Sequence, residues 1–258
     1  MNQYTTDFFH TNQKYSLRAA QYIVPLVLEI IPAQRVIDIG CGDGTWLKVF
    51  QENGVEEILG IDGDYVENSS LVIPKTKFLP FDLTQSLTLD EKFDLVVSLE
   101  VAEHLPPNCA EIFIDSLTNL GSVILFSAAI PYQWGENHIN TQWQDYWINL
   151  FEKRGFVVVD CIRHKIWNNE NVAVWFRQNI LMFVKKSYLE VSPSLQQQIQ
   201  INKNPYSHLS IVHPQFYLRA IEKMKKEVDP ETVSLKEVLS KLPIVMKQAI
   251  QRRVNLFR

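Results

Sequence analysis

The sequence predicts an α/β protein whose doubly wound sheet has about seven strands and becomes antiparallel at its last edge. Short apolar runs alternate with helical patterns from residue 36 to residue 151, an order that favours parallel strands joined by crossover helices. Two more apolar runs, 156–161 and 180–184, follow and would close the sheet. With 258 residues, 46% of them hydrophobic, the chain can bury one large core or a main domain plus an appendage.

The predicted strands are short runs rich in β-branched and aromatic residues, and the fourth is apolar enough to be buried on both faces. In chain order they cover residues 36–39, 57–62, 77–83, 93–100, 123–126, 156–161 and 180–184. Ligands of open α/β sheets bind at the carboxyl ends of the strands. Functional residues are therefore expected directly after these runs.

A helix is expected before the first strand, from Lys14 to Ile31, because apolar residues recur there at helical spacing. Its apolar face consists of Ala20, Ile23, Val24, Val27, Ile30 and Ile31. Pro25 lacks the amide that a helix interior needs. The pattern therefore predicts a kink or two abutting helices.

Two later crossover helices have recognisable start signals. One opens at Pro106-Pro107 and stops at Gly121, and its residues Ile112, Phe113 and Leu117 are expected to face the sheet. The other follows the sequence 141–144, Thr-x-x-Gln, which has the spacing of a capping box.

The first strand runs into three glycines at alternate positions, Gly40, Gly42 and Gly44, and a helical pattern over 45–51 follows. Glycines let the backbone turn sharply and approach a ligand that a Cβ would block. Amides at a helix start favour an anionic group such as a carboxylate. The Gly-x-Gly-x-Gly spacing, with Asp38 two residues earlier, differs from the Gly-x-Gly-x-x-Gly of dinucleotide-binding loops.

An acidic residue ends each of the next three strands. Asp62 lies 22 residues beyond Gly40, a distance suited to accepting both hydroxyls of an adenosine ribose. Asp82 closes the third strand and Glu100 the fourth. Each acid alone could be a turn former, but all of them in this order at one sheet edge favour a nucleoside-binding site.

The glycine loop with these acids resembles motif I and the following motifs of the class I S-adenosylmethionine-dependent methyltransferases. The resemblance covers roughly residues 36–184 and implies a Rossmann-like fold that binds S-adenosylmethionine. It implies that Asp82 accepts a hydrogen bond from the adenine amino group and that the next amide, of Leu83, donates to the ring. The cofactor contacts expected on this basis are Asp38, Gly40, Cys41, Gly42, Gly44, Asp62, Gly63, Asp82, Leu83, Leu99 and Glu100.

The segment after the fourth strand, Glu-x-x-Glu-His at residues 100–104, resembles two metal-assisted subgroups of this family. These are the ubiquinone-pathway O-methyltransferases and the small-RNA 3′-end 2′-O-methyltransferases. The resemblance implies that Glu100, Glu103 and His104, with His138 as a fourth ligand, hold Mg²⁺, Mn²⁺ or Zn²⁺. The alternative is that Glu103 caps the next helix while His104 forms a hydrogen bond within its own loop.

The loop after the fifth strand, residues 126–143, is polar, aromatic and hinged by glycine, and it is expected to lie over the site. His138 titrates in a useful range and is a candidate general base. His104 and Glu103 are the other candidates on the acceptor side. Asn140 and Gln142 would recognise hydroxyls of the acceptor, and the tryptophans 134 and 143 would either stack on a ring or anchor the next helix.

The motifs at 98–106, 126–131 and 138–143 together resemble a bacterial subgroup associated with surface-glycan or secondary-metabolite chemistry. The expected reaction is methyl transfer from S-adenosylmethionine to a hydroxyl of a small molecule or saccharide. Two alternatives stay open at this point. One is an NAD-dependent oxidoreductase, which shares an acid after the second strand but not the glycine spacing or Asp82. The other is a catalytically silent methyltransferase fold that serves as a binding subunit.

Composition sets the remaining expectations. The net charge of −4 gives no general attraction to nucleic acid, and no nucleic-acid partner is expected. Three scattered cysteines, Cys41, Cys109 and Cys161, suit a reducing compartment, and no secretory signal is visible, so a cytoplasmic protein is expected.

The domain prediction is a methyltransferase domain over residues 1–185 and a mostly helical extension over 186–258. The last segment, Lys241 to Arg258, has five basic residues and no acids, interleaved with apolar ones. Such a segment suits contact with a membrane surface or an acidic partner, or docking as a helix with a solvated face.

Overall fold

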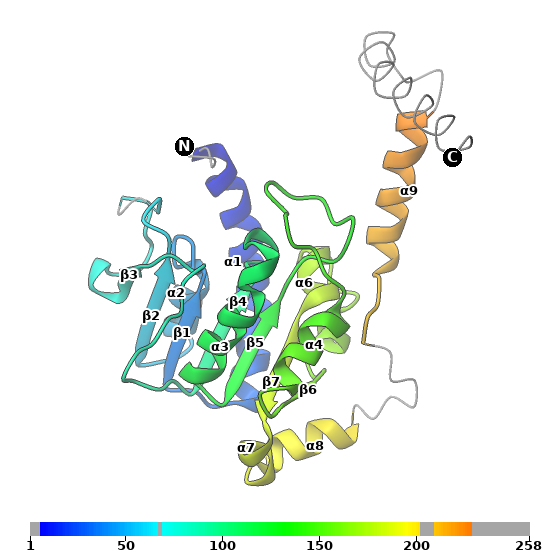
Figure 1. The fold of residues 1–258 in the computed structure, drawn as a ribbon. Helices are drawn as coiled ribbons and strands as arrows, with labels where there is room; N and C mark the ends of the chain where they lie inside the picture. Colours follow the sequence, from blue (N-terminus) through cyan, green and yellow to red (C-terminus); the bar gives the residue numbers. More distant parts are fainter. Residues whose placement is uncertain (1–5, 67–68, 202–208, 229–258) are drawn as a thin grey trace, which may run out of the picture. The chain divides into compact units, whose positions relative to one another are not determined.

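The computed structural model describes residues 6–66, 69–201 and 209–228 (Figure 1), with side chains described for 14–66, 69–200 and 209–224. The chain divides into two compact units, residues 1–211 and 212–258. The basic segment 241–258 lies outside the described residues. The predicted domain boundary between residues 185 and 186 stays a prediction.

The first unit is built on a seven-stranded sheet with the strand order β3-β2-β1-β4-β5-β7-β6. Its strands are β1 (Arg35–Ile39), β2 (Glu57–Asp62), β3 (Phe78–Pro80), β4 (Leu95–Leu99), β5 (Val123–Ser127), β6 (Phe156–Val159) and β7 (Leu181–Lys185). The pairs from β3 through β5 are parallel, and β7 pairs antiparallel with both β5 and β6. This confirms the predicted Rossmann-like sheet and its antiparallel edge.

Helices cover both faces of the sheet (Figure 1). The α-helices of the first unit are α1 (Thr6–Ile30), α2 (Thr45–Glu52), α3 (Ala110–Leu120), α4 (Gln144–Glu152), α5 (Arg163–Ile166), α6 (Val174–Asn179), α7 (Lys186–Glu190) and α8 (Pro193–Ile201). The described residues also form three short 3-10 helices, η1 (Lys75–Lys77), η2 (Ala102–His104) and η3 (Pro107–Cys109), and α9 (Pro214–Val228) belongs to the second unit.

Alternation along the strands divides the core into two layers. Val36 of β1 packs with the buried faces of α1 and α2, whereas its neighbour Ile37 packs with those of α3 and α4. Neighbouring side chains of a strand point to opposite faces, so each buried strand supplies both layers. This two-sided burial holds the carboxyl ends of the central strands in fixed positions.

The N-terminal helix differs from the predicted broken helix. α1 is continuous from Thr6 to Ile30 with Pro25 inside it. Pro25 lies on the exposed side, while Ile23, Val24 and Val27 of the predicted apolar face are fully buried. Each buried aliphatic side chain contributes about 1.5–3 kcal/mol, which together exceeds the roughly 3 kcal/mol that an internal proline costs.

Two local predictions were wrong. Ile112 is 40% exposed, because the buried face of α3 is set by Phe113 and Leu117, and Ile112 is turned away from their midline. The capping box is absent, since α4 begins at Gln144 and no side chain caps it. The Gln144 side chain instead donates a hydrogen bond to the carbonyl of Ile211, at 3.2 Å.

None of the described helices is both long enough and apolar enough to cross a membrane.

Candidate cofactor and acceptor site

A pocket of about 1260 Å³ opens at the carboxyl ends of β1, β2 and β4. β1 is the point where the strand order reverses direction, and open α/β sheets bind ligands in the crevice at such a point. The loops after β3 and β5, together with α6, complete its walls. The pocket is larger than the roughly 300–1,000 Å³ typical of one small-molecule site.

The glycine loop after β1 forms one wall. Gly40, Gly42 and Gly44 all have left-handed backbones, with φ of 86°, 54° and 85°. A Cβ on Gly40 would come within 2.3 Å of Val101 Cγ2, so this position also lacks space for a side chain. Gly40 and Gly42 line the pocket together with Cys41, whereas Gly44 is the N-cap of α2 and does not line it.

The acid after β2 is held rigidly at the edge of the pocket. One oxygen of Asp62 accepts from the amide of Gly42, at 2.7 Å. The other accepts from the amide of Gly63, at 2.7 Å, and from the hydroxyl of Tyr65, at 2.5 Å. Burial raises the pKa of Asp62, and the three hydrogen bonds oppose that shift. Asp62 and Gly63 both line the pocket.

Asp38 occupies a different place from Asp62. It is 3% exposed and does not line the pocket. Burial first, and then the charges of Asp62 and Asp43, raise its pKa well above the usual value. Its predicted contact with the cofactor stays a prediction.

The residues after β3 also face the pocket, although β3 ends at Pro80, earlier than predicted. Asp82 accepts hydrogen bonds from the amide and the hydroxyl of Thr84, at 3.0 and 2.7 Å. These bonds lower the pKa of Asp82. Leu83, which is nearly buried, lines the pocket beside it.

The acid after β4 is fixed by amide side chains. Glu100 has a left-handed backbone, with φ of 57°, and lines the pocket next to Leu99. Its Oε2 accepts a hydrogen bond from Gln133 Nε2, at 2.7 Å, and its Oε1 accepts one from Asn179 Nδ2, at 3.1 Å. Burial raises the pKa of Glu100, and these bonds lower it.

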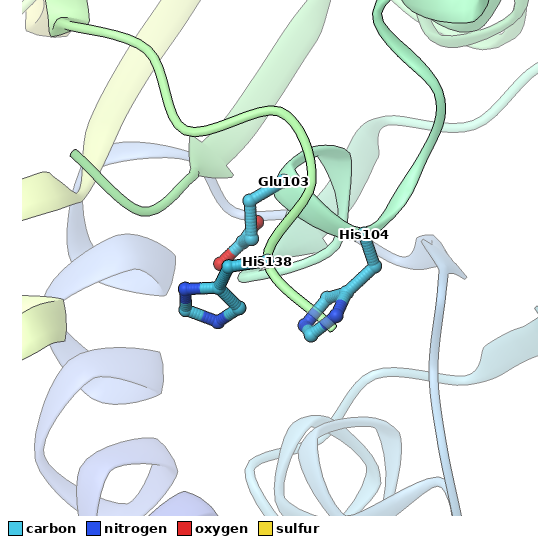
Figure 2. A group of neighbouring side chains, drawn as sticks. All are labelled: Glu103, His104 and His138. Atoms are coloured by element: carbon cyan, nitrogen blue, oxygen red, sulfur yellow. The ribbon is translucent and has the colours of Figure 1, made fainter. Parts of the chain in front are cut away.

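The other three predicted metal ligands form a cluster without Glu100 (Figure 2). Ligand atoms of Glu103, His104 and His138 all lie within 4.8 Å of one another. The ring centroids of His104 and His138 are 4.9 Å apart. Glu103 and His104 belong to η2, and His138 belongs to the loop after β5. The amides of Ile139 and Asn140 hold this loop against η2 by donating to the carbonyl of Glu103.

Glu103 is the buried member of the cluster. It is fully buried, and no hydrogen bond of standard geometry reaches its carboxylate oxygens, which lie near the Glu100 side chain and the Ala129 backbone. Burial, and then the charge of Glu100, raise its pKa well above the usual value. The alternative that Glu103 caps the next helix is wrong, because no side chain caps η3 or α3.

The surroundings of both histidines favour the uncharged imidazole. Burial, and then the neighbouring His138, lower the pKa of His104 to about 4, and a hydrogen bond from the ring to the backbone carbonyl of Asn137 opposes that shift. Burial also lowers the pKa of His138. His138 Nδ1 lies 3.2 Å from the carbonyl oxygen of Gln133, so a proton on Nδ1 leaves Nε2 as the basic nitrogen.

The acceptor-side loop matches the prediction only in part. Trp134 lines the pocket and is 38% exposed. Trp143 is exposed but lies outside the lining, as do Asn140 and Gln142, which instead bond to each other at 3.1 Å. The expected role of these two amides in acceptor recognition is therefore not supported by their position.

Sequence reasoning missed the contribution of α6. Trp175 and Phe176 line the pocket, and Phe176 packs edge-on against Trp46 with ring centroids 5.3 Å apart. Asn179, at the end of the same helix, reaches Glu100 across 79 residues of sequence. The adjacent aromatics before the last strand were the one local signal that could have indicated this helix.

A family model described as a methyltransferase domain matches residues 9–160. The sugar N-methyltransferase KedS8 from Streptoalloteichus sp ATCC 53650 resembles the chain with 13% identity and a TM-score of 0.52, over 70% of this chain and 93% of that one. Magnesium protoporphyrin IX methyltransferase ChlM from Synechocystis PCC 6803, with bound SAH, resembles the chain with 18% identity and a TM-score of 0.51, over 71% of this chain and 89% of that one. DesVI from Streptomyces venezuelae resembles the chain with 16% identity and a TM-score of 0.51, over 69% of this chain and 96% of that one.

A search of the curated proteins finds no match. The three structural likenesses show the fold alone at such identities. The family match decides against the NAD-dependent oxidoreductase, which would share only an acid after the second strand. The family match spans more than half of the chain, and the fold agrees with that match. The chain therefore belongs to the methyltransferase domain family and is an S-adenosylmethionine-dependent methyltransferase.

Proposed function

We propose that the protein transfers the methyl group to a hydroxyl of a small molecule or saccharide. The observation that carries this proposal is that one pocket borders both Asp62 and the cluster of Glu103, His104 and His138. Its volume suits a cofactor and an acceptor together. The ribose would be held by Asp62, the adenine by the residues around Asp82, and the acceptor beside the cluster.

Methyl transfer from a sulfonium is an in-line displacement. The acceptor oxygen forms a bond to the methyl carbon while the carbon–sulfur bond breaks, and its electron pair stays on sulfur. The hydroxyl proton passes to Nε2 of His138, the nitrogen left free when Nδ1 faces the Gln133 carbonyl. The rest of the acceleration comes from holding the two reactants in line and close together.

A variant pair tests the role of His138. His138→Ala should lower kcat by about 10²–10⁴-fold, the usual contribution of a general base, while cofactor affinity changes little. His164→Ala removes an exposed histidine away from the pocket and serves as the control. The measurement is release of S-adenosylhomocysteine with a panel of matched hydroxyl and amine acceptors. Full turnover by the His138 variant would exclude it as the base.

The same side chains fit a divalent ion. Glu103 offers two buried oxygens that no hydrogen bond of standard geometry satisfies, next to two imidazoles, a mixture that suits Zn²⁺ or Mn²⁺. Glu103, His104 and His138 would hold the ion, and a bound ion would lower the pKa of an acceptor hydroxyl. Glu100 would not join them, because both of its oxygens accept amide hydrogen bonds.

Metal content separates these two uses of the cluster. If the cluster binds an ion, the purified protein should retain stoichiometric metal, and Glu103→Gln should release it. Metal-free protein with full activity after dialysis against a chelator would leave only the general-base role. Binding of S-adenosylhomocysteine without methylation of any acceptor, in the panel or in lysate, would favour the catalytically silent alternative.

A further inference from the structure

The backbone at Glu100 is held in a conformation that few residues other than glycine adopt. Its φ is 57°, and its amide donates to the carbonyl oxygen of Ser127 at 2.9 Å and to the Ser127 hydroxyl oxygen at 3.1 Å. A left-handed non-glycine residue is strained and persists only when its surroundings fix it. Glu100 follows β4 directly and lines the pocket.

The carboxylate of Glu100 accepts from two amide side chains and lies against the carboxyl group of Glu103. Gln133 donates to one oxygen and Asn179 to the other, and Asn179 also donates to the side-chain oxygen of Gln133, at 2.9 Å. Both oxygens accept N–H donors, and the pKa of Glu103 is raised further than that of Glu100, so the arrangement suits an ionised Glu100 beside an uncharged Glu103. We call the side chains of Glu100, Gln133 and Asn179 the amide clamp.

The amide clamp supplies no positive charge. Over residues 14–66, 69–200 and 209–224, no lysine or arginine lines the pocket, and no ion pair involves Glu100. A buried carboxylate without a cation is costly unless a ligand supplies one. Burial accordingly raises the pKa of Glu100, and a cationic ligand beside the carboxylate would stabilise its ionised form.

We propose that Glu100 is the counter-charge of the cofactor sulfonium, and that Gln133 and Asn179 are positioning residues that hold it there. This inference rests on the proposed function. With adenosine beside Asp62 and Asp82, the methyl group must point toward Glu103, His104 and His138 to reach an acceptor. The sulfur then lies between the glycine loop and that cluster, at the tip of β4, where Glu100 stands.

The reaction removes this charge. S-adenosylmethionine carries a sulfonium, whereas S-adenosylhomocysteine has a neutral thioether at the same atom. Attraction to a carboxylate several ångströms away in a partly buried site is worth about a factor of ten or more in affinity. The amide clamp should therefore favour the substrate form of the cofactor over the product form and assist product release.

Calorimetric titration with both cofactor forms tests the proposal. Glu100→Gln should weaken binding of S-adenosylmethionine about tenfold more than binding of S-adenosylhomocysteine. Asn179→Ala keeps the carboxylate but removes one donor, and it should shift the ratio of the two affinities in the same direction by a smaller factor. Glu136→Gln removes the same charge from an exposed residue lining the pocket and should leave the ratio near the wild-type value.

The possible results distinguish a failure of the proposed function from a failure of the role proposed for Glu100. Wild-type protein that binds neither cofactor form would overturn the proposed function itself. Wild-type protein that binds both, with the same affinity ratio in the Glu100 and Asn179 variants, would overturn this inference alone. If the Glu100 variant is unfolded by thermal melting, the Asn179 ratio decides.

Discussion

Asp62 is the residue on which cofactor binding should depend most. Its two oxygens already organise the amides of Gly42 and Gly63 and the hydroxyl of Tyr65. Removing the carboxylate leaves these donors and the ribose hydroxyls without an acceptor, which costs roughly 1–3 kcal/mol. Asp62→Ala should thus weaken binding of S-adenosylhomocysteine by that amount in a calorimetric titration. Unchanged affinity would show that the ribose binds elsewhere.

The raised pKa of Asp62 gives this binding a pH dependence. Ribose hydroxyls donate to the ionised carboxylate, so affinity is full above the raised pKa and falls as the pH drops through it. Because burial moves that pKa upward, the fall should begin at a higher pH than the value of about 3.9 for an exposed aspartate would give. Dissociation constants measured from about pH 8 down to pH 5 test this. The same curve in Asp62→Asn would assign the titration to another group.

Gly135 should be needed for the position of His138. A Cβ at Gly135 would lie 2.0 Å from His138 Nε2, so the imidazole would have to move. Gly135→Ala should therefore lose most turnover while it keeps cofactor affinity and melting temperature. Gly54→Ala is the matched control. A Cβ at Gly54 would meet no other atom, but the φ of 96° is strained for alanine, so this variant should lose stability and keep its turnover. Full activity of the Gly135 variant would contradict the role of the imidazole.

At the scale of residues, the sequence could indicate what lies near a strand end but not what comes from far along the chain. The glycines and Asp62 follow their strands directly, so spacing alone located them. Asn179 reaches Glu100 only because α6 precedes β7, the strand beside β5, and no local pattern encodes such a long-range pairing. The sequence predicted Glu103, His104 and His138 as members of one metal site together with Glu100. Glu100 is not part of the cluster, and one of its oxygens accepts a hydrogen bond from the distant Asn179.

At the scale of elements, α1 gives a stability prediction. Pro25 sits inside a continuous helix on its exposed side and cannot donate to the carbonyl of residue 21. Pro25→Ala should raise the free energy of unfolding by about 1–3 kcal/mol, measured by chemical denaturation. Gln21→Ala, at an exposed position of the same helix, should change it by far less. A destabilised Pro25 variant would mean that the proline fits a local bend.

The elements themselves were predictable where burial enforces a simple pattern. All seven strands follow apolar runs, and α2 ends before Gly54 as its sequence indicates. α4 begins at Gln144 with Trp143 as its N-cap, so Thr141 lies too early to cap it, and the Gln144 side chain donates to the backbone carbonyl of Ile211. A side chain that forms a tertiary hydrogen bond is not free to cap a helix, even where the local sequence has the spacing of a capping box.

At the scale of the whole molecule, the order of strands and helices determined the fold, and the fold determined the pocket. The reversal of strand order at β1 brings the ends of β1, β2 and β4 together. The acceptor does not follow from this frame, since acceptor loops vary on a shared scaffold. Its chemistry must come from the loop after β5 and from α6, whose side chains fill the rest of the pocket.

The central claim is that these strand ends form one binding site for S-adenosylmethionine. Its most direct test is a calorimetric titration of the wild-type protein with S-adenosylhomocysteine and, separately, with NADH. We predict saturable binding of one S-adenosylhomocysteine per chain and none of NADH. Binding of NADH without S-adenosylhomocysteine would contradict the account.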